Sequence, residues 1–274
     1  MGVLVRGGAG AGTAGAARQT AADVAAAYDA FAPFYDAFTA DYNHDSWMAD
    51  VEAWAREAGL RGTQVLDVAC GTGASFVPLV RRGYEVCACD ISPAMVSRAR
   101  EKLGRDGEVV VADMRDLPWR ERFDLVTCVD DSMNYMLCEA DLVAALSSMR
   151  DALVPGGMLV FDTNSLATYR SVFAGHFTVD AGPNRFLWEG EGSEFMPAGE
   201  IASVSIWRIG PDGNVPVGRH VQRHHPIAEL QDACELAGLD CLGFRGQVPG
   251  GALTADPDEE SNTKIVCMAA RPPT

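Results

Sequence analysis

Short apolar runs alternate with amphipathic segments through the middle of the chain. The apolar runs predict buried strands at Gln64–Val68, Glu85–Asp90, Val109–Ala112, Phe123–Val129 and Met158–Asp162. Between them, apolar positions at helical spacing predict helices over 74–82, after Ser92-Pro93 and over 141–153. Strands that alternate with helices are typical of a parallel sheet covered on both faces, so an α/β fold is predicted.

The two flanks of this region carry different patterns. Residues 21–38 and the stretch after Asp45 predict two helices, the first of them rich in Tyr and Phe. After Ser165, strand-like pieces at 185–188, 201–209 and 219–223 are joined by turns, among them the hairpin signal Pro211-Asp212-Gly213-Asn214. These pieces predict an inserted antiparallel layer rather than a second domain. A helix over 226–236 and strands at 239–244 and 264–269 follow.

The patterns divide the chain into one domain and a leader. We expect a disordered leader over 1–18, rich in Gly and Ala, and a single domain over 19–274. Within that domain we expect a helical cap (19–60), a cofactor-binding core (61–164), an inserted substrate layer (165–225), and a C-terminal helix with a strand pair (226–274).

Composition narrows the choice of partners. The net charge of −16 argues against nucleic acid, whose phosphates need a basic surface. No apolar run reaches the length of a membrane span. The leader consists largely of Gly and Ala and lacks the continuous apolar region of a signal peptide. We therefore expect a cytoplasmic protein with no membrane partner. Eight cysteines without a CxxC pair favour buried free thiols over a metal site or a disulfide framework.

Acidic residues end four of the predicted strands. They are Asp67, Asp90, Asp113 and Asp130. The carboxyl ends of parallel strands share one edge of a sheet, where α/β proteins bind their ligands. The first strand runs directly into the glycine turn 69–73, which allows backbone to approach a cofactor closely. A dinucleotide site would need a third glycine where Phe76 stands, which disfavours a nicotinamide cofactor.

The stretch Asp67-Val68-Ala69-Cys70-Gly71-Thr72-Gly73 resembles the first motif of class I S-adenosylmethionine-dependent methyltransferases. The resemblance runs from about Tyr28 to Pro155 and resumes at the terminal strand pair, which looks like that fold's reversed last hairpin. The stretch Phe31-Ala32-Pro33-Phe34-Tyr35-Asp36 is similar to sugar N-methyltransferases of macrolide biosynthesis and to other natural-product methyltransferases. The resemblance implies S-adenosylmethionine as cofactor, with S-adenosylhomocysteine as its product.

The resemblance implies a role for each position of the strand-end motif. It places the methionine end of the cofactor against Ala69, Gly71 and Gly73, with Asp67 supporting the turn below them. Asp90, with Ile91 beside it, would accept hydrogen bonds from the ribose diol, the alternative for Asp90 being a helix N-cap. The remaining cofactor positions are Asp113 and Met114 at the adenine, Val129 and Asp130 near the sulfonium, and the aromatic residues Tyr28, Tyr35 and Trp47. For these three aromatic residues the alternative is plain core packing.

The acceptor side depends on residues after the fourth and fifth strands and at the return from the inserted layer. We expect the acceptor to contact Asp131, Asn134, Tyr135, Asn164 and Arg223. His224 or His225 could remove a proton from the acceptor, and Tyr35 is the third candidate for a catalytic role. Because neighbouring strand residues point to opposite faces, no more than one of the two histidines is expected to act.

These observations predict a small-molecule methyltransferase that transfers a methyl group in line. An amine of a natural product or amino sugar is the first choice of acceptor, and O-methylation of a hydroxyl is the second. A nicotinamide oxidoreductase and a non-catalytic cofactor-binding partner protein are the alternatives from other classes. The sequence leaves the acceptor and the oligomeric state open, and no metal site is expected.

Overall fold

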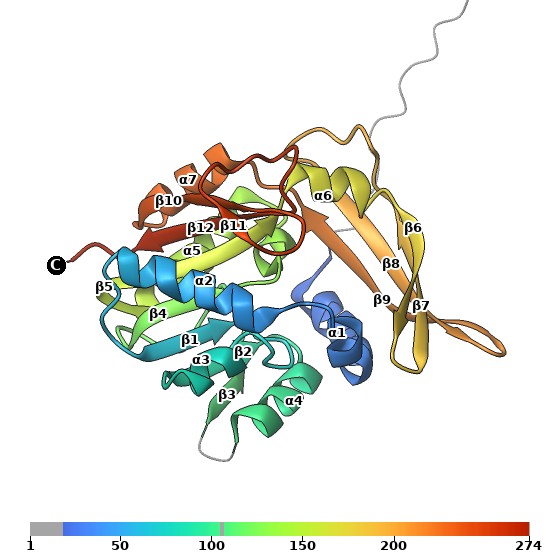
Figure 1. The fold of residues 1–274 in the computed structure, drawn as a ribbon, viewed down its shortest axis with the longest axis horizontal. Helices are drawn as coiled ribbons and strands as arrows, with labels where there is room; N and C mark the ends of the chain where they lie inside the picture. Colours follow the sequence, from blue (N-terminus) through green and yellow to red (C-terminus); the bar gives the residue numbers. More distant parts are fainter. Residues whose placement is uncertain (1–18, 105–106, 274) are drawn as a thin grey trace, which may run out of the picture.

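A mostly parallel sheet forms the centre of the molecule in the computed structural model, which describes residues 19–104 and 107–273 (Figure 1). Its strands are β1 (Gln64–Val68), β2 (Glu85–Asp90), β3 (Glu108–Val111), β4 (Phe123–Cys128), β5 (Leu153–Asn164), β10 (Asp240–Gln247), β11 (Leu253–Thr254) and β12 (Lys264–Ala270). Within the described part of the chain their order is β11-β10-β12-β5-β4-β1-β2-β3. Strands β1 to β5 pair in parallel, and β12 runs antiparallel between β5 and β10. The predicted α/β class and the reversed last hairpin are confirmed.

Helices cover both faces of this sheet because alternate strand residues point to opposite sides. The helices are α2 (His44–Glu57), α3 (Val77–Arg81), α4 (Pro93–Leu103), α5 (Glu139–Ala152) and α7 (Ile227–Leu236). On one face Val65 belongs to a core that includes residues of α2, α3 and α4. On the other face its neighbour Leu66 belongs to a core with residues of α5 and α7. Both residues are fully buried, as expected for a strand of a parallel sheet.

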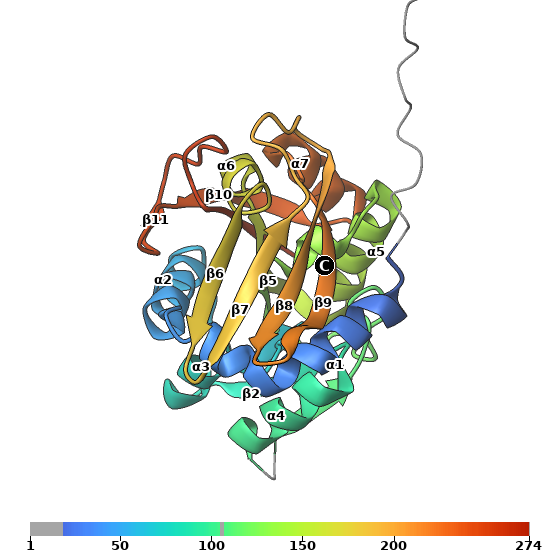
Figure 2. The same cartoon turned by 90° about the vertical axis from the view of Figure 1, so that its right-hand side faces the viewer.

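A second, antiparallel sheet follows the core and stands beside it (Figure 2). Its order is β6 (His176–Ala181), β7 (Asn184–Gly190), β8 (Ile201–Gly210) and β9 (Gly213–Arg223), and the short helix α6 (Leu166–Ser171) leads into it. One face packs on helix α1 (Ala21–Phe38), where Phe31 meets Phe186 at a ring-centroid distance of 5.9 Å. The predicted inserted antiparallel layer is confirmed.

Several element boundaries differ from those that the pattern predicts. The helix predicted over 74–82 is only the short helix α3, because residues 74–76 still belong to the turn that follows β1. Strand β5 begins at Leu153, before the Pro155-Gly156-Gly157 stretch that was expected to separate helix from strand. The separate strand β6 and helix α6 were not predicted.

The disordered leader and the cytoplasmic location both remain predictions. The expected leader over 1–18 lies outside the described residues. None of the helices in the part of the chain that the structure describes is long and apolar enough to span a bilayer.

Candidate functional site

The turn after β1 is built on backbone conformations that few residues adopt. Ala69, Gly71 and Gly73 have φ angles of 54°, 53° and 88°. The fully buried Asp67 holds this turn against β4, because its carboxylate accepts hydrogen bonds from Ser75 Oγ and Thr127 Oγ1, each at 2.6 Å. Burial raises the pKa of Asp67 to about 6. Asp67 therefore supports the turn from beneath, as predicted, and does not line a cavity.

Glycine is required at position 73 by packing within the protein itself. A Cβ atom at this position would lie 2.3 Å from the ring of Phe76, which is completely buried. Phe76 thus occupies the space that a third glycine would leave open in a dinucleotide fold. Gly71 differs, because a Cβ there would meet only Tyr35 Cε1 at 3.6 Å, and the residue faces a cavity.

Asp90 ends β2 with both carboxylate oxygens directed at neighbouring backbone. Oδ2 accepts from Gly71 N at 2.9 Å and Oδ1 accepts from Ser92 N at 2.8 Å. The N-cap of α4 is Ser92, whose Oγ accepts from Met95 N at 3.1 Å, so Asp90 is not the cap. Each oxygen of Asp90 keeps a further lone pair for an incoming hydroxyl. Burial raises the pKa of Asp90 to about 6.

A cavity of about 580 Å³ lies along the ends of the first four strands, and we call it the strand-end cavity. Of the predicted cofactor residues, it is lined by Tyr28, Tyr35, Ala69, Gly71, Asp90, Ile91, Asp113, Met114, Val129 and Asp130. Tyr135, predicted for the acceptor, also lines it, and Met136 and Leu137 add an apolar wall that the pattern did not reveal. The Asp113 carboxylate is held by Arg115, with Nη2 to Oδ2 at 2.6 Å.

A second cavity of about 600 Å³ lies between the antiparallel sheet, the edge of the central sheet and helices α1 and α2, and we call it the inter-sheet cavity. It shares Tyr28, Tyr35, Asp130 and Tyr135 with the strand-end cavity. The two cavities therefore meet at a junction of aromatic rings and one carboxylate.

Besides the four shared residues, three predicted residues line the inter-sheet cavity alone. Asp131 and Asn164, expected at the acceptor, both line it. Trp47 was expected at the cofactor, but it does not line the strand-end cavity. The residue lines the inter-sheet cavity instead, with Lys264 Nζ 5.8 Å from its ring centroid.

The junction tyrosines form a hydrogen-bonded chain. Tyr28 Oη lies 2.8 Å from Tyr135 Oη, which lies 2.8 Å from His220 Nδ1. Burial raises the pKa of Tyr28, Tyr35 and Tyr135 and lowers that of His220 to about 4. All four groups are therefore uncharged near neutral pH, and their hydroxyls and rings are held in place by one another.

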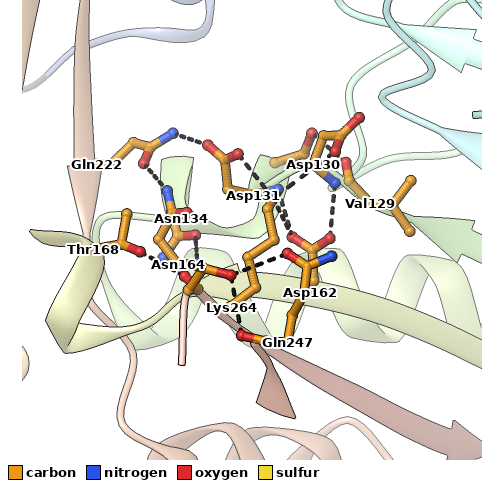
Figure 3. Close-up of polar contacts among 12 residues, drawn as sticks. Val129, Asp130, Asp131, Asn134, Asp162, Asn164, Thr168, Gln222, Gln247 and Lys264 are labelled. Atoms are coloured by element: carbon orange, nitrogen blue, oxygen red, sulfur yellow. Dashed lines mark hydrogen bonds and ion pairs between the residues drawn. The ribbon is translucent and has the colours of Figure 1, made fainter. Parts of the chain in front are cut away.

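Asp130 and Asp131 follow β4 in a strained conformation, with φ angles of 61° and 55°. Such a left-handed conformation costs about 1–2 kcal/mol per residue. Asp162, at the end of β5, stabilises the pair, because its carboxylate accepts from both backbone N–H groups and from Lys264 Nζ at 3.2 Å (Figure 3). Burial raises the pKa of Asp162 to about 6. Lys264 Nζ also donates to Asp131 Oδ1 at 3.1 Å.

The Asp130 side chain has one oxygen that is bound and one that is not. His44 Nε2 lies 2.8 Å from Oδ2, whereas Oδ1 is buried and accepts no hydrogen bond from any residue that the structure describes. Burial is the largest single influence on the His44 pKa and lowers it, but the hydrogen bond to Asp130 and the charges of Asp130 and Asp67 together outweigh it and raise the pKa. Lys264 Nζ lies 3.9 Å from Oδ1, beyond hydrogen-bond distance, so this oxygen can still accept a hydrogen bond from a positively charged ligand.

Four of the residues predicted for the acceptor side line neither cavity. Arg223 binds Glu229, and its Nε donates to Gly199 O at 3.0 Å. Asn134 is fully buried and joins two segments, donating to Arg223 O at 2.7 Å and accepting from Asn164 N at 2.8 Å.

The two histidines predicted as bases are also buried in structural positions. His224 Nδ1 accepts from Gly199 N at 3.1 Å, with the ring packed edge-on to Tyr169. His225 lies against Arg223 and Glu229, and burial lowers its pKa to about 4. The expected alternation fails because β9 ends at Arg223, so both side chains lie beyond the strand.

Sequence reasoning missed His44 and Lys264, which lie close to Asp130 at 2.8 Å and 3.9 Å. Lys264 carried a usable signal, because it is the one charged residue in the apolar strand Lys264–Ala270. His44 carried no such signal, because a histidine in the first turn of a helix is just as often exposed to solvent.

Residues 65–157 match the family described as methyltransferase domain. A Bacillus subtilis protein named as a methyltransferase, YqeM, is 29% identical over 217 residues, which cover 77% of this chain and 86% of that protein. A dTDP-3-amino-3,6-dideoxy-alpha-D-glucopyranose N,N-dimethyltransferase of Streptomyces fradiae is 29% identical over 237 residues, covering 82% and 88%.

The solved structure of an S-adenosylmethionine-dependent methyltransferase from Clostridium acetobutylicum has the same fold. Its TM-score is 0.74 at 24% identity, and the match covers 89% of this chain and 99% of that one. Residues 65–157 therefore form a methyltransferase domain, and the described chain shares the fold of this S-adenosylmethionine-dependent enzyme.

Proposed function

We propose that this enzyme methylates an amine nitrogen of a small molecule that binds in the inter-sheet cavity, with S-adenosylmethionine in the strand-end cavity. The observation that carries the proposal is the junction of the two cavities, where Oδ1 of Asp130 accepts no hydrogen bond from the described residues and has only Lys264 Nζ near it, at 3.9 Å. The Streptomyces fradiae relative is named as acting on an amino sugar, which supports an amine over a hydroxyl.

The residues of the strand-end cavity fit S-adenosylmethionine. Asp90 has free lone pairs for a ribose diol, Met114 and Leu137 offer apolar contact for an adenine ring, and Asp130 offers its carboxylate to a sulfonium or an ammonium. When bound, S-adenosylmethionine supplies a methyl carbon that an uncharged nitrogen can attack with its lone pair, leaving S-adenosylhomocysteine. Tyr28, Tyr35 and Tyr135 surround the junction and exclude water from it.

Most small-molecule amines enter as ammonium ions and must lose a proton before they can attack. His44 is placed to take that proton. Its Nε2 is bound to Asp130, whereas its Nδ1 makes no hydrogen bond within the described residues, and the residue lines the inter-sheet cavity. The carboxylate of Asp130 orients the imidazole and, by raising its pKa, makes it a stronger proton acceptor. In this proposal His44 replaces His224 and His225.

The remaining expectations belong to the same proposal. We keep the division of the domain into cap, core, inserted layer and C-terminal pair. In it, the inserted layer supplies one wall of the acceptor site. Every cysteine in the described residues is a free thiol, which supports a reducing compartment and hence the cytoplasm. A role in natural-product biosynthesis is supported by the amino-sugar relative, and a nucleic-acid partner is disfavoured by the charge of −16.

Thermal unfolding with candidate cofactors tests the assignment. A ligand that binds only the folded state raises the melting temperature, and at one hundred times its Kd it adds about 2.7 kcal/mol. S-adenosylhomocysteine should therefore raise the melting temperature and NAD should not, and Asp90→Ala should remove the effect. Stabilisation by NAD alone would favour an oxidoreductase. Binding without methylation of any amine or hydroxyl in a broad panel would favour a non-catalytic partner protein, and methylation of hydroxyls alone would favour O-methylation.

His44→Gln tests the proton acceptor. The glutamine amide can still donate to Asp130 but cannot take a proton, so kcat at pH 7 should fall by about a hundredfold. The deficit should narrow at high pH, where the amine loses its proton to water, and the melting-temperature shift by S-adenosylhomocysteine should be unchanged. His176→Gln on the exposed edge strand β6 is the matched control. An unchanged kcat and pH profile in His44→Gln would remove His44 from the mechanism.

A further inference from the structure

The inter-sheet cavity contains no free cationic side chain among the described residues that line it. Its lysine, Lys264, lies 3.1 Å from Asp131, 3.2 Å from Asp162 and 3.9 Å from Asp130, so its charge is more than balanced. His44 is bound to Asp130, and no arginine within residues 19–104 and 107–273 lines the cavity.

Acidic residues line the same cavity. Asp41 and Asp50 join Asp130 and Asp131 in its wall, and Asp41 is exposed. The N-terminus of α2, which could otherwise attract an anion, is capped by Asn43 Oδ1 accepting from Ser46 N and carries Asp45 in its first turn. The cavity therefore has a negative potential from the junction to its edge.

Most arginines near the antiparallel sheet are ion-paired, and Arg208, which has no ion pair among the described residues, packs over the Phe34 ring and does not line the cavity. Arg170 binds Glu260 at 2.6 Å and Arg185 binds Asp180 at 2.6 Å, while Arg219 binds Glu191 at 2.7 Å. Phosphate recognition in proteins relies on Arg, Lys or open helix N-termini. A nucleoside diphosphate with its sugar in this cavity would meet carboxylates where it needs cations.

The remaining wall of the cavity consists of uncharged polar side chains, such as Asn164, Thr168 and Gln222, and of a large apolar and aromatic part. The apolar and aromatic part includes Phe31, Phe38, Phe173, Trp188, Val204 and Ile206. Aromatic faces attract cations and pack against apolar groups, and they offer nothing to a phosphate.

We infer that the acceptor is a phosphate-free amine, cationic in solution and with an apolar body, and not the nucleotide-linked amino sugar of the Streptomyces fradiae relative. The inference rests on the proposed function, because it assigns a substrate class to the same cavity. The ammonium would be recognised by Asp130 and the apolar body by the aromatic wall. The reaction that supplies the acceptor would then either release the amine from a nucleotide carrier or make it without one.

A matched set of acceptors tests this assignment. One 3-amino-3,6-dideoxyhexose is compared as its dTDP ester, its methyl glycoside and its benzyl glycoside, so that the reacting amine is the same in all three. We expect kcat/KM for the benzyl glycoside to exceed that for the dTDP ester by tenfold or more, because like charges opposed across a binding surface cost several kcal/mol. A preference for the dTDP ester would overturn the inference and leave the proposed function standing. If none of the three nor any other amine is methylated although S-adenosylhomocysteine binds, the proposed function fails instead.

Asp41→Lys probes the charge of the cavity without touching the junction. It should shift the ratio of kcat/KM values about threefold towards the dTDP ester, and the shift should shrink in high salt. Asp212→Lys, at the exposed turn between β8 and β9, makes the same change in net charge and should leave the ratio unaltered. Equal shifts in the two variants would mean that overall charge, and not the cavity, selects the acceptor.

Discussion

At the scale of single residues, the candidate site depends on carboxylates held in unusual environments. Asp162 illustrates the principle, since it binds the two strained N–H groups of Asp130 and Asp131 and the Lys264 ammonium together. A buried carboxylate with three donors positions its neighbours instead of reacting. The strained backbone at 130–131 is thereby held where the two cavities meet.

Asp90 leads to a prediction about pH. Burial raises its pKa to about 6, so the carboxylate that would accept from the ribose diol becomes protonated below that pH. The affinity for S-adenosylhomocysteine, measured by calorimetry, should therefore fall by about tenfold between pH 7 and pH 5. Asp90→Asn should bind more weakly at pH 7 and show little further change. A pH dependence that persisted in Asp90→Asn would point to another carboxyl group.

Loss of the fold does not account for this expected fall in affinity. Asp67, Asp90 and Asp162 all have pKa values raised to about 6 from 3.8, so the folded state binds protons more tightly than the unfolded state. Their contribution to stability is fully present below pH 3.8 and is lost as pH rises through about 6. At pH 5 these groups therefore favour the folded state more than they do at pH 7.

At the scale of elements, the turn between β1 and α3 combines a left-handed conformation with close packing. Gly73 and Gly83 have φ angles of 88° and 89°, but only Gly73 has a side chain, Phe76, above it. The two glycines thus separate the cost of backbone strain from the cost of crowding.

Replacing each glycine by alanine should give different losses of stability. Gly83→Ala should lower the free energy of unfolding by about 1 kcal/mol, because nothing lies within 4 Å of its Cβ and only backbone strain is added. Gly73→Ala should lower it by about 3 kcal/mol, since the Phe76 ring must also move. Urea denaturation measures both. Equal losses would show that Phe76 yields without cost.

The elements also show how far the pattern of apolar residues reaches. Buried strands such as Phe123–Cys128 and Lys264–Ala270 were predicted nearly to the residue, because a strand buried on both faces is apolar throughout. Strand β6 was missed, since most of its residues are exposed and leave no such run. The helix predicted from residue 74 was too long, because Phe76 packs on Gly73 within the turn and α3 begins only at Val77. The pattern of apolar residues does not report such packing.

At the scale of the whole molecule, the packing of one sheet beside the other creates the inter-sheet cavity, which is the proposed acceptor site. The inter-sheet cavity draws on α1, α2, the ends of β4 and β5, the antiparallel strands and the start of β12. Residues as distant as His44 and Lys264 meet Asp130 there. His224 and His225, although close in sequence to lining residues of β9, are directed into a packed region beyond the strand. Nearness along the chain did not predict a place in the cavity.

The sequence by itself determined the fold class and most residues of the strand-end cavity, because the glycine turn and the acidic strand ends lie in the continuous stretch from Asp67 to Asp130. Parallel strands bring their carboxyl ends to one edge, so order along the chain translates directly into position around that cavity. Only the tertiary structure decided the acceptor side. Its residues come from segments more than 200 positions apart, which the contact of the two sheets brings together. The periodicity of apolar residues predicts that a face is buried, but it does not predict which other element covers that face.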